Sequence, residues 1–167
     1  QNRIGINTGQ MVTGNMGSAS RMNYTMMGDT VNLAARLEAS AKQYGIYIQI
    51  ADTTYQPVKD QIVIRDLDFV RVMGKTEPAQ VYELISETGQ EPELYKKILP
   101  AFHEALALYR NQEWNNAIEA FKASDELEDM FPGRKTNPSR IYIPRCEHYR
   151  DNSPGDDWDG AWTLTSK

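Results

Sequence analysis

The hydrophobic residues of this chain change their spacing at Thr88-Gly89-Gln90, and this change limits the folds that the chain can adopt. Before that point, short segments with a two-residue period alternate with helical segments, which is typical of a mixed fold. After Glu91, apolar residues recur at spacings of three and four, as on an amphipathic helix. We therefore predict an α+β unit over residues 1–88, an all-α helical extension over 92–150 and an extended tail over 151–167.

Most strands of the first unit are predicted from the two-residue period. The segments with this period are Arg3–Thr8, Tyr24–Met27, Tyr47–Ile50, a pair of strands within Ile62–Met73, and Ala79–Ile85. The glycine-punctuated run Gln10–Gly17 is expected to return as a hairpin or a bent strand, and the polar residues Ser18–Asn23 to form a loop. A short helix is expected over Asp52–Lys59.

The clearest helix signal begins at Gly28 and ends at Gly45. Asp29 or Thr30 can cap the first free amides, and glycine is the residue that most often follows the last turn. The apolar stripe consists of Leu33, Leu37 and Ala41. Asp29 fits a helix cap better than it fits a metal ligand.

Asn32 and Arg36 lie four residues apart in this predicted helix, so their side chains project from the same face. The spacing alone favours a solvated helix face, on which both residue types are common.

Three helices are predicted after Glu91. The first has Leu94, Ile98, Phe102, Leu106 and Tyr109 on one face, and Pro100 should kink or divide it. The second starts at Glu113 with Trp114, Ala117, Ile118 and Phe121. The third begins at Asn137-Pro138, a cap followed by a first-turn proline, and runs toward Tyr149.

Composition excludes several classes of protein. The net charge is −5 without a basic run, which argues against direct nucleic-acid binding. The single cysteine, Cys146, cannot form an intrachain disulfide, so a reducing compartment such as the cytoplasm is expected. Apolar runs are shorter than the roughly 20 residues of a membrane span. The start at Gln1 suggests a segment of a longer polypeptide.

Two stretches carry a family resemblance. RIGINTGQMVTGNMGSASRMNYTMMGDTVNLAARLE (residues 3–38) and VMGKTEPAQVYEL (residues 72–84) resemble the C-terminal half of a class III nucleotidyl cyclase catalytic domain. The resemblance implies a ferredoxin-like core that dimerises with the nucleotide at the interface. It also implies closure of ATP or GTP to the 3′,5′-cyclic monophosphate with release of pyrophosphate, in intracellular signalling.

The resemblance assigns roles to four residues. Arg36 matches the arginine that stabilises charge on the α-phosphate in the transition state, and Asn32 matches the asparagine that positions the ribose. Thr25 matches the position that contacts the purine edge, where a bacterial adenylyl subgroup also carries Thr. Lys75 matches the lysine of the family's Gly-Lys before the last strand and is expected to bind the substrate. Met73 stands where members often have a second basic residue, which grips the terminal phosphates.

The resemblance also implies two divalent metal ions, Mg²⁺ or Mn²⁺, whose aspartate ligands precede Gln1 in the family. We therefore expect an adenylate cyclase region that is inactive as this fragment alone, in a protein that is membrane-anchored only through upstream segments. The alternatives are a guanylate cyclase and a catalytically degenerate domain that regulates or dimerises.

The helical extension has two interpretations. The spacing of Trp114, Ala117 and Phe121 is similar to part of a tetratricopeptide repeat, which would give a surface for protein contact. One repeat is weak support, because a stable solenoid usually needs about three repeats. The alternative is that these helices pack against the cyclase core or its dimer partner.

Overall fold

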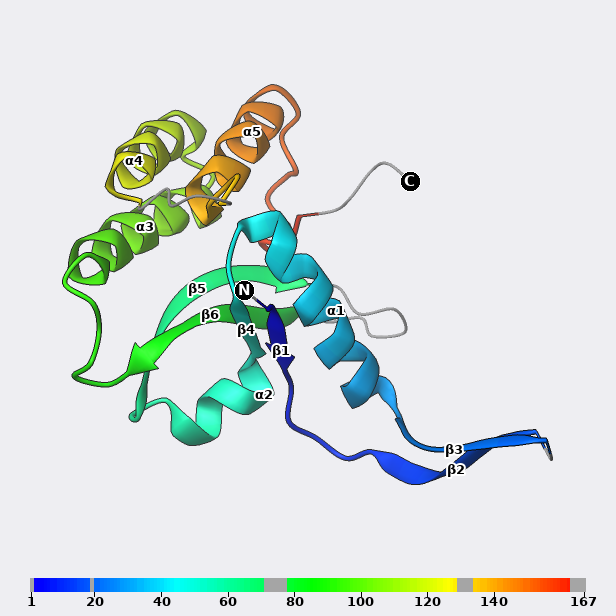
Figure 1. Cartoon of the computed structure of the whole chain (residues 1–167). Helices are drawn as coiled ribbons and strands as arrows, with labels where there is room; N and C mark the ends of the chain where they lie inside the picture. The colour runs from blue at the N-terminus through cyan, green and yellow to red at the C-terminus, as the bar shows by residue number, and fades with distance from the viewer. Residues whose placement is uncertain (1, 19, 71–77, 129–133, 163–167) are drawn as a thin grey trace.

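The computed structural model describes residues 2–18, 20–70, 78–128 and 134–162 (Figure 1). Its elements in chain order are β1 (Ile4–Ile6), β2 (Val12–Ser18), β3 (Arg21–Met27), α1 (Asp29–Tyr44), β4 (Ile48–Ala51), α2 (Asp52–Tyr55), the 3-10 turn η1 (Gln56–Val58), β5 (Ile62–Val70), β6 (Ala79–Glu87), α3 (Tyr95–Arg110), α4 (Trp114–Leu127) and α5 (Pro138–Asp151). None of the helices in these ranges is long and apolar enough to cross a membrane. The mixed α+β class predicted from the sequence is confirmed.

A four-stranded sheet with the order β1-β4-β6-β5 forms the centre of the first part. β1 pairs with β4 in parallel, whereas β6 is antiparallel to both β4 and β5. Two strands were expected within Ile62–Met73. This prediction is wrong for residues 62–70, which form the single strand β5. Residues 71–73 lie outside the described ranges.

The hairpin differs from the expectation. β2 pairs with β3 from Val12 opposite Met27 to Ser18 opposite Arg21, so most of the expected loop over Ser18–Asn23 is strand. Polarity suggested a loop, but the alternation of polar and apolar residues continues through this segment. A Cβ atom on Gly17 of β2 would lie 2.0 Å from the Arg21 carbonyl oxygen, so this strand position requires glycine. The hairpin projects away from the sheet (Figure 1).

α1 packs its apolar face on the sheet. Leu37 and Ala41 are buried in one cluster with Leu67 and Val81, as the apolar stripe predicts. The expected cap by Asp29 or Thr30 is not found. The N-cap residue is Gly28, at φ 141°, and no side chain makes a capping hydrogen bond. Gly45 adopts the left-handed conformation and ends the helix, as predicted.

Helix α4 packs against both α3 and α5, and the three helices lie together beside the sheet (Figure 1). Phe102, Phe121 and Tyr142 meet in their core, where the last two rings stack 4.9 Å apart. Pro100 lies inside α3 without dividing it. Asn137 caps α5 as predicted, because its side chain accepts a hydrogen bond from the Arg140 amide at 3.1 Å.

The tail after α5 folds back onto these helices. The Trp158 ring lies 5.1 Å from the Tyr109 ring, and Ala161 is buried. The expected extended surface tail is therefore wrong for the described residues up to Trp162. We call the described residues from Tyr95 to Trp162, connecting segments included, the helical extension.

Candidate functional site

The two residues predicted to act together lie on the exposed side of α1. Asn32 and Arg36 are both exposed, whereas Leu37, one position further along, is buried against the sheet. Neither polar side chain forms a hydrogen bond or ion pair with any residue that the structure describes. An amide and a guanidinium one helical turn apart therefore face solvent together, and both can donate to an oxygen-rich ligand.

The position of α1 is fixed near its first turns by direct backbone approach. A Cβ atom on Gly5 of β1 would lie 2.2 Å from the Ala34 carbonyl oxygen, so a larger residue there would push the helix off the sheet. Asn7, after β1, donates from Nδ2 to the Thr30 carbonyl oxygen at 3.0 Å. Thr53 in turn donates to Asn7 Oδ1 at 2.7 Å. These contacts hold the helical turns that present Asn32 and Arg36.

Thr25 lies on β3, the strand that leads into α1, and its side chain is exposed opposite Gly14 of β2. Within the described ranges, no hydrogen bond links Thr25 to Asn32 or Arg36. Lys75 and Met73, the positions expected near the triphosphate, lie outside the described residues. Of the four predicted site residues, Asn32 and Arg36 are thus brought together on one helix face, and Thr25 precedes them on the adjoining strand.

A pocket of about 260 Å³ lies beside the first turn of α1. Its lining includes Asn7, Asp29, Thr30 and Asp52. Asp52 already accepts hydrogen bonds from Tyr82 and Gln56, each at 2.8 Å. Across the part of the chain that the structure describes, no group of three or more His, Cys, Asp or Glu side chains could hold a metal ion. The described residues therefore do not fit a two-metal site.

Sequence reasoning missed the residues that hold the other end of α1. Tyr44 in its last turn donates to Asp68 of β5, and Asp68 also pairs with Arg145 of α5. Arg145 and Asp68 lie 77 positions apart, so no local spacing could have joined them. The one available signal was the presence of charged residues within the strand Ile62–Val70.

Comparison with known proteins gives a consistent match for the first part. The family model described as the adenylate and guanylate cyclase catalytic domain matches residues 1–86. A terminal-differentiation-specific adenylate cyclase of Dictyostelium discoideum is 37% identical over 147 residues, covering 86% of this chain and 7% of that protein. Adenylate cyclase 1 of Rhizobium meliloti is 37% identical over 83 residues, covering 50% of this chain and 12% of that protein.

Among solved structures, the adenylyl cyclase CyaB from P. aeruginosa is 37% identical, with a TM-score of 0.44 over 54% of this chain and 45% of that chain. The chain thus spans less than half of each of these three relatives.

Proposed function

Because the chain belongs to the adenylate and guanylate cyclase catalytic-domain family, we propose that it contributes the ribose-binding and transition-state residues of an adenylate cyclase. This enzyme is a phosphorus–oxygen lyase that converts ATP to 3′,5′-cyclic AMP and pyrophosphate. The observation that carries the proposal is the unpaired, exposed Asn32 and Arg36 pair on α1, inside the matched residues.

Each of these side chains has a separate task in the reaction. The ribose 3′-oxygen loses its proton and bonds to the α-phosphorus, and the bond from that phosphorus to the pyrophosphate oxygen breaks. Negative charge grows on the α-phosphoryl oxygens as the phosphorus becomes five-coordinate, and the Arg36 guanidinium donates hydrogen bonds to them. The Asn32 amide holds the ribose so that its 3′-oxygen approaches in line.

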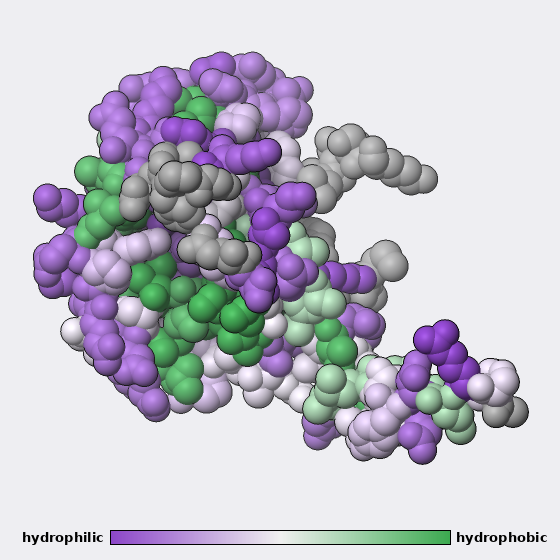
Figure 2. Space-filling model, in the orientation of Figure 1, coloured by the Kyte–Doolittle hydropathy of each residue, from purple (hydrophilic) through white to green (hydrophobic). Residues whose placement is uncertain are grey.

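We propose that the site is completed by a second copy of the chain. Asn32 and Arg36 face outward, so their ligand must be covered from another side. The hairpin beside them exposes large apolar side chains on both strands: Val12, Met22, Tyr24, Met26 and Met27, each more than half exposed. Hydrophobic side chains along this projecting arm are visible in Figure 2. An apolar arm of this kind is stabilised by burial against a partner.

We propose that the metal ions of the reaction are held by carboxylates outside the described residues, as the resemblance to class III cyclases implies. Carboxylate oxygens are the ligands that Mg²⁺ prefers. Asp29 and Asp52 line the pocket beside α1 but belong to no larger cluster of described metal-ligating side chains.

The substrate preference gives the first test of this proposal. In the full-length protein with Mg²⁺ or Mn²⁺, we expect turnover of ATP to exceed that of GTP. Thr25→Ala should lower the ATP-to-GTP ratio of kcat/KM about fivefold, the effect of one hydrogen bond worth about 1 kcal/mol. Thr13→Ala, which removes an exposed hydroxyl from the neighbouring strand of the same hairpin, is the matched control.

Guanylate cyclase is the second candidate, because the family model includes both activities. A wild-type preference for GTP would support this candidate and contradict the proposed substrate. An unchanged ratio in Thr25→Ala would mean that the Thr25 hydroxyl does not contact the purine.

A second prediction concerns residues 1–167 as a separate protein. We expect no cyclic AMP above a buffer blank with ATP and Mg²⁺ or Mn²⁺. The charge of the triphosphate must be neutralised by metal ions, and the described residues contain no cluster of ligands that could hold one. The full-length protein at the same concentration is the control. Turnover by residues 1–167 that Arg36→Ala abolishes would contradict our placement of the metal ligands.

A further inference from the structure

The last residues of α1 are held by the helical extension rather than by the sheet alone. Tyr44 and Gly45 both contact side chains or backbone from residues 134–145, although the partners lie 89 to 101 positions apart in the sequence. The helix that carries Asn32 and Arg36 therefore has one end on β1 and the other against the extension.

The first contact is a buried polar triad. Arg145 Nη1 lies 2.5 Å from Asp68 Oδ2, and the side chains are 10% and 4% exposed. Tyr44 donates to the same Asp68 oxygen at 2.5 Å, and Arg145 Nη2 donates to the Tyr44 hydroxyl at 3.4 Å. Burial, together with the Asp68 carboxylate, raises the pKa of Tyr44, so its hydroxyl stays protonated and can donate. One carboxylate thus joins α1, β5 and α5.

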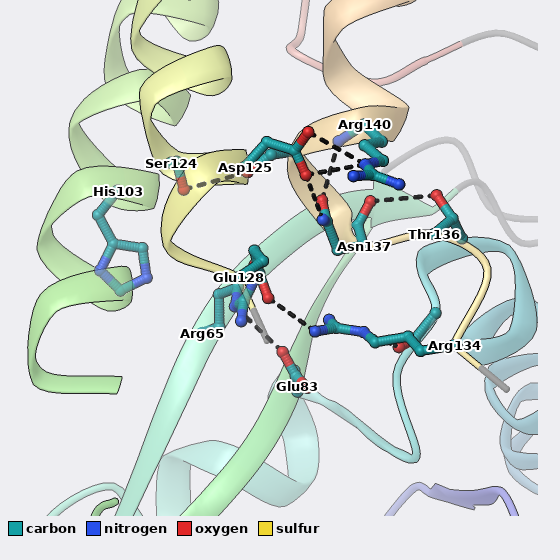
Figure 3. Close-up of polar contacts among 12 residues, drawn as sticks. Arg65, Glu83, His103, Ser124, Asp125, Glu128, Arg134, Thr136, Asn137 and Arg140 are labelled. Carbon is teal, nitrogen blue, oxygen red and sulfur yellow. Dashed lines mark hydrogen bonds and ion pairs between the residues drawn. The ribbon is translucent and has the colours of Figure 1, made fainter. Parts of the chain in front are cut away.

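The second contact is made by the loop before α5. Arg134 donates from Nε to the Gly45 carbonyl oxygen at 3.1 Å and pairs with Glu128 at 2.8 Å (Figure 3). A Cβ atom on Gly45 would lie 2.0 Å from the Thr136 carbonyl oxygen. Since Gly45 also has φ 66°, only glycine allows both the helix end and this close approach. The loop therefore lies directly against the end of α1.

We propose that the helical extension is part of the catalytic unit, with Tyr44, Asp68 and Arg145 as positioning residues that set where α1 presents Asn32 and Arg36. The proposal rests on the cyclase function proposed above. Tyr44 lies eight residues, or about two turns, after Arg36 on the same rigid helix, so a shift at its end moves the guanidinium as well. A shift of this kind lowers the rate because the reaction depends on alignment to within a fraction of an ångström.

The decisive variant is Tyr44→Phe in the full-length protein. It keeps the ring and the Asp68–Arg145 ion pair but removes the hydrogen bond from α1. Arg145→Met is the more drastic change, and Tyr44→Phe decides the question if Arg145→Met fails to fold. Tyr109→Phe is the matched control, because the buried Tyr109 hydroxyl has no hydrogen-bond partner among the described residues.

Two measurements separate positioning from general stability. We expect Tyr44→Phe to lower kcat about tenfold at a temperature well below the Tm of every variant, with KM for ATP unchanged. We also expect Tyr44→Phe to broaden or shift the distribution of distances between spin labels attached at Ala39→Cys and Lys59→Cys. Unlabelled protein in excess ensures that the distance is measured within one chain. Both sites are exposed. Burial raises the pKa of Cys146 to about 12, so its thiol does not compete for the label.

The outcomes distinguish this proposal from the proposed function. If Tyr44→Phe matches Tyr109→Phe in kcat, KM and label distance, the extension does not position α1, and the cyclase function stands. If the wild-type protein turns over neither ATP nor GTP, the cyclase function fails, and the label distances alone decide whether the extension sets the position of α1. A fall in kcat with unchanged distances would contradict positioning and assign Tyr44 an effect of another kind.

Discussion

Replacing Arg36 with alanine in the full-length protein is expected to lower kcat for ATP about a hundredfold or more, while KM changes little. The guanidinium is exposed and has no partner among the described residues, so the protein loses no internal contact with it. In its proposed role it meets charge that develops mainly in the transition state, and removing one donor of this kind typically costs a hundredfold to a thousandfold in rate. Steady-state kinetics of the wild-type protein and of Arg36→Ala, with ATP as substrate, provides the measurement.

Two further variants make this result specific. Arg36→Lys keeps the positive charge but not the planar fork, so it should recover only part of the activity. Arg150→Ala removes another exposed arginine, one on α5 that pairs with its neighbour Asp151, and should leave kcat unchanged. A loss in Arg36→Ala that appears as a rise in KM with an unaltered kcat would mean that Arg36 binds the ground state and transition state equally.

Replacing Arg65 with methionine is expected to lower the free energy of unfolding by about 3–5 kcal/mol, the cost of breaking a buried ion pair. The Arg65 side chain is fully buried between Glu83 of β6 and Glu128 after α4 (Figure 3). Its guanidinium also lies 5.1 Å from the Phe102 ring of α3. Arg65 Nε is 3.1 Å from Glu83 Oε2, but neither atom has the geometry of a hydrogen bond, so this contact is an ion pair only.

The loss of unfolding free energy in Arg65→Met should become smaller as the pH falls. Burial raises the pKa of Glu83, and Arg65 opposes that rise, so removing Arg65 raises the pKa further. Between the ordinary value of 4.5 and this raised pKa, the folded variant binds more protons than the unfolded chain. Its stability therefore increases as the pH falls through the raised pKa toward 4.5. Urea unfolding at pH 7 and pH 5 measures the difference.

Lys122→Met provides the control for Arg65→Met. Lys122 pairs with Glu119 on the exposed side of α4, and both side chains are more than half exposed. A surface change of this kind should alter the free energy of unfolding by no more than about 0.5 kcal/mol. A similarly small effect of Arg65→Met would show that the buried network contributes little net stability.

The parts of the fold that the sequence predicted are those set by local signals. The helix between Gly28 and Gly45 and the Asn137 cap of α5 depend on residues within one turn, and both are found as expected. The hairpin pairing was missed because it depends on which segment completes the ladder, and polarity misled the assignment of Ser18–Asn23. The shared helix face of Asn32 and Arg36 was predictable from a spacing of four, whereas their roles were assigned only by the family resemblance.

The contacts between the extension and the first part could not be predicted. In β5, Arg65 and Asp68 are both buried, although charged residues in a strand ordinarily indicate a solvent-facing side. Their partners, Glu128 and Arg145, lie 63 and 77 positions further along the chain. Only the folded arrangement shows that the extension covers the charged positions of this strand and neutralises them.

The charged interior of β5 has a consequence for gene fusion. A chimaera that joins residues 1–88 to a different C-terminal segment would leave Asp68 without Arg145 and Arg65 without Glu128. An uncompensated buried charge destabilises a protein by several kcal/mol, so the new segment would have to supply an arginine and a glutamate at matching places. The helices after Glu91 are therefore not a portable module.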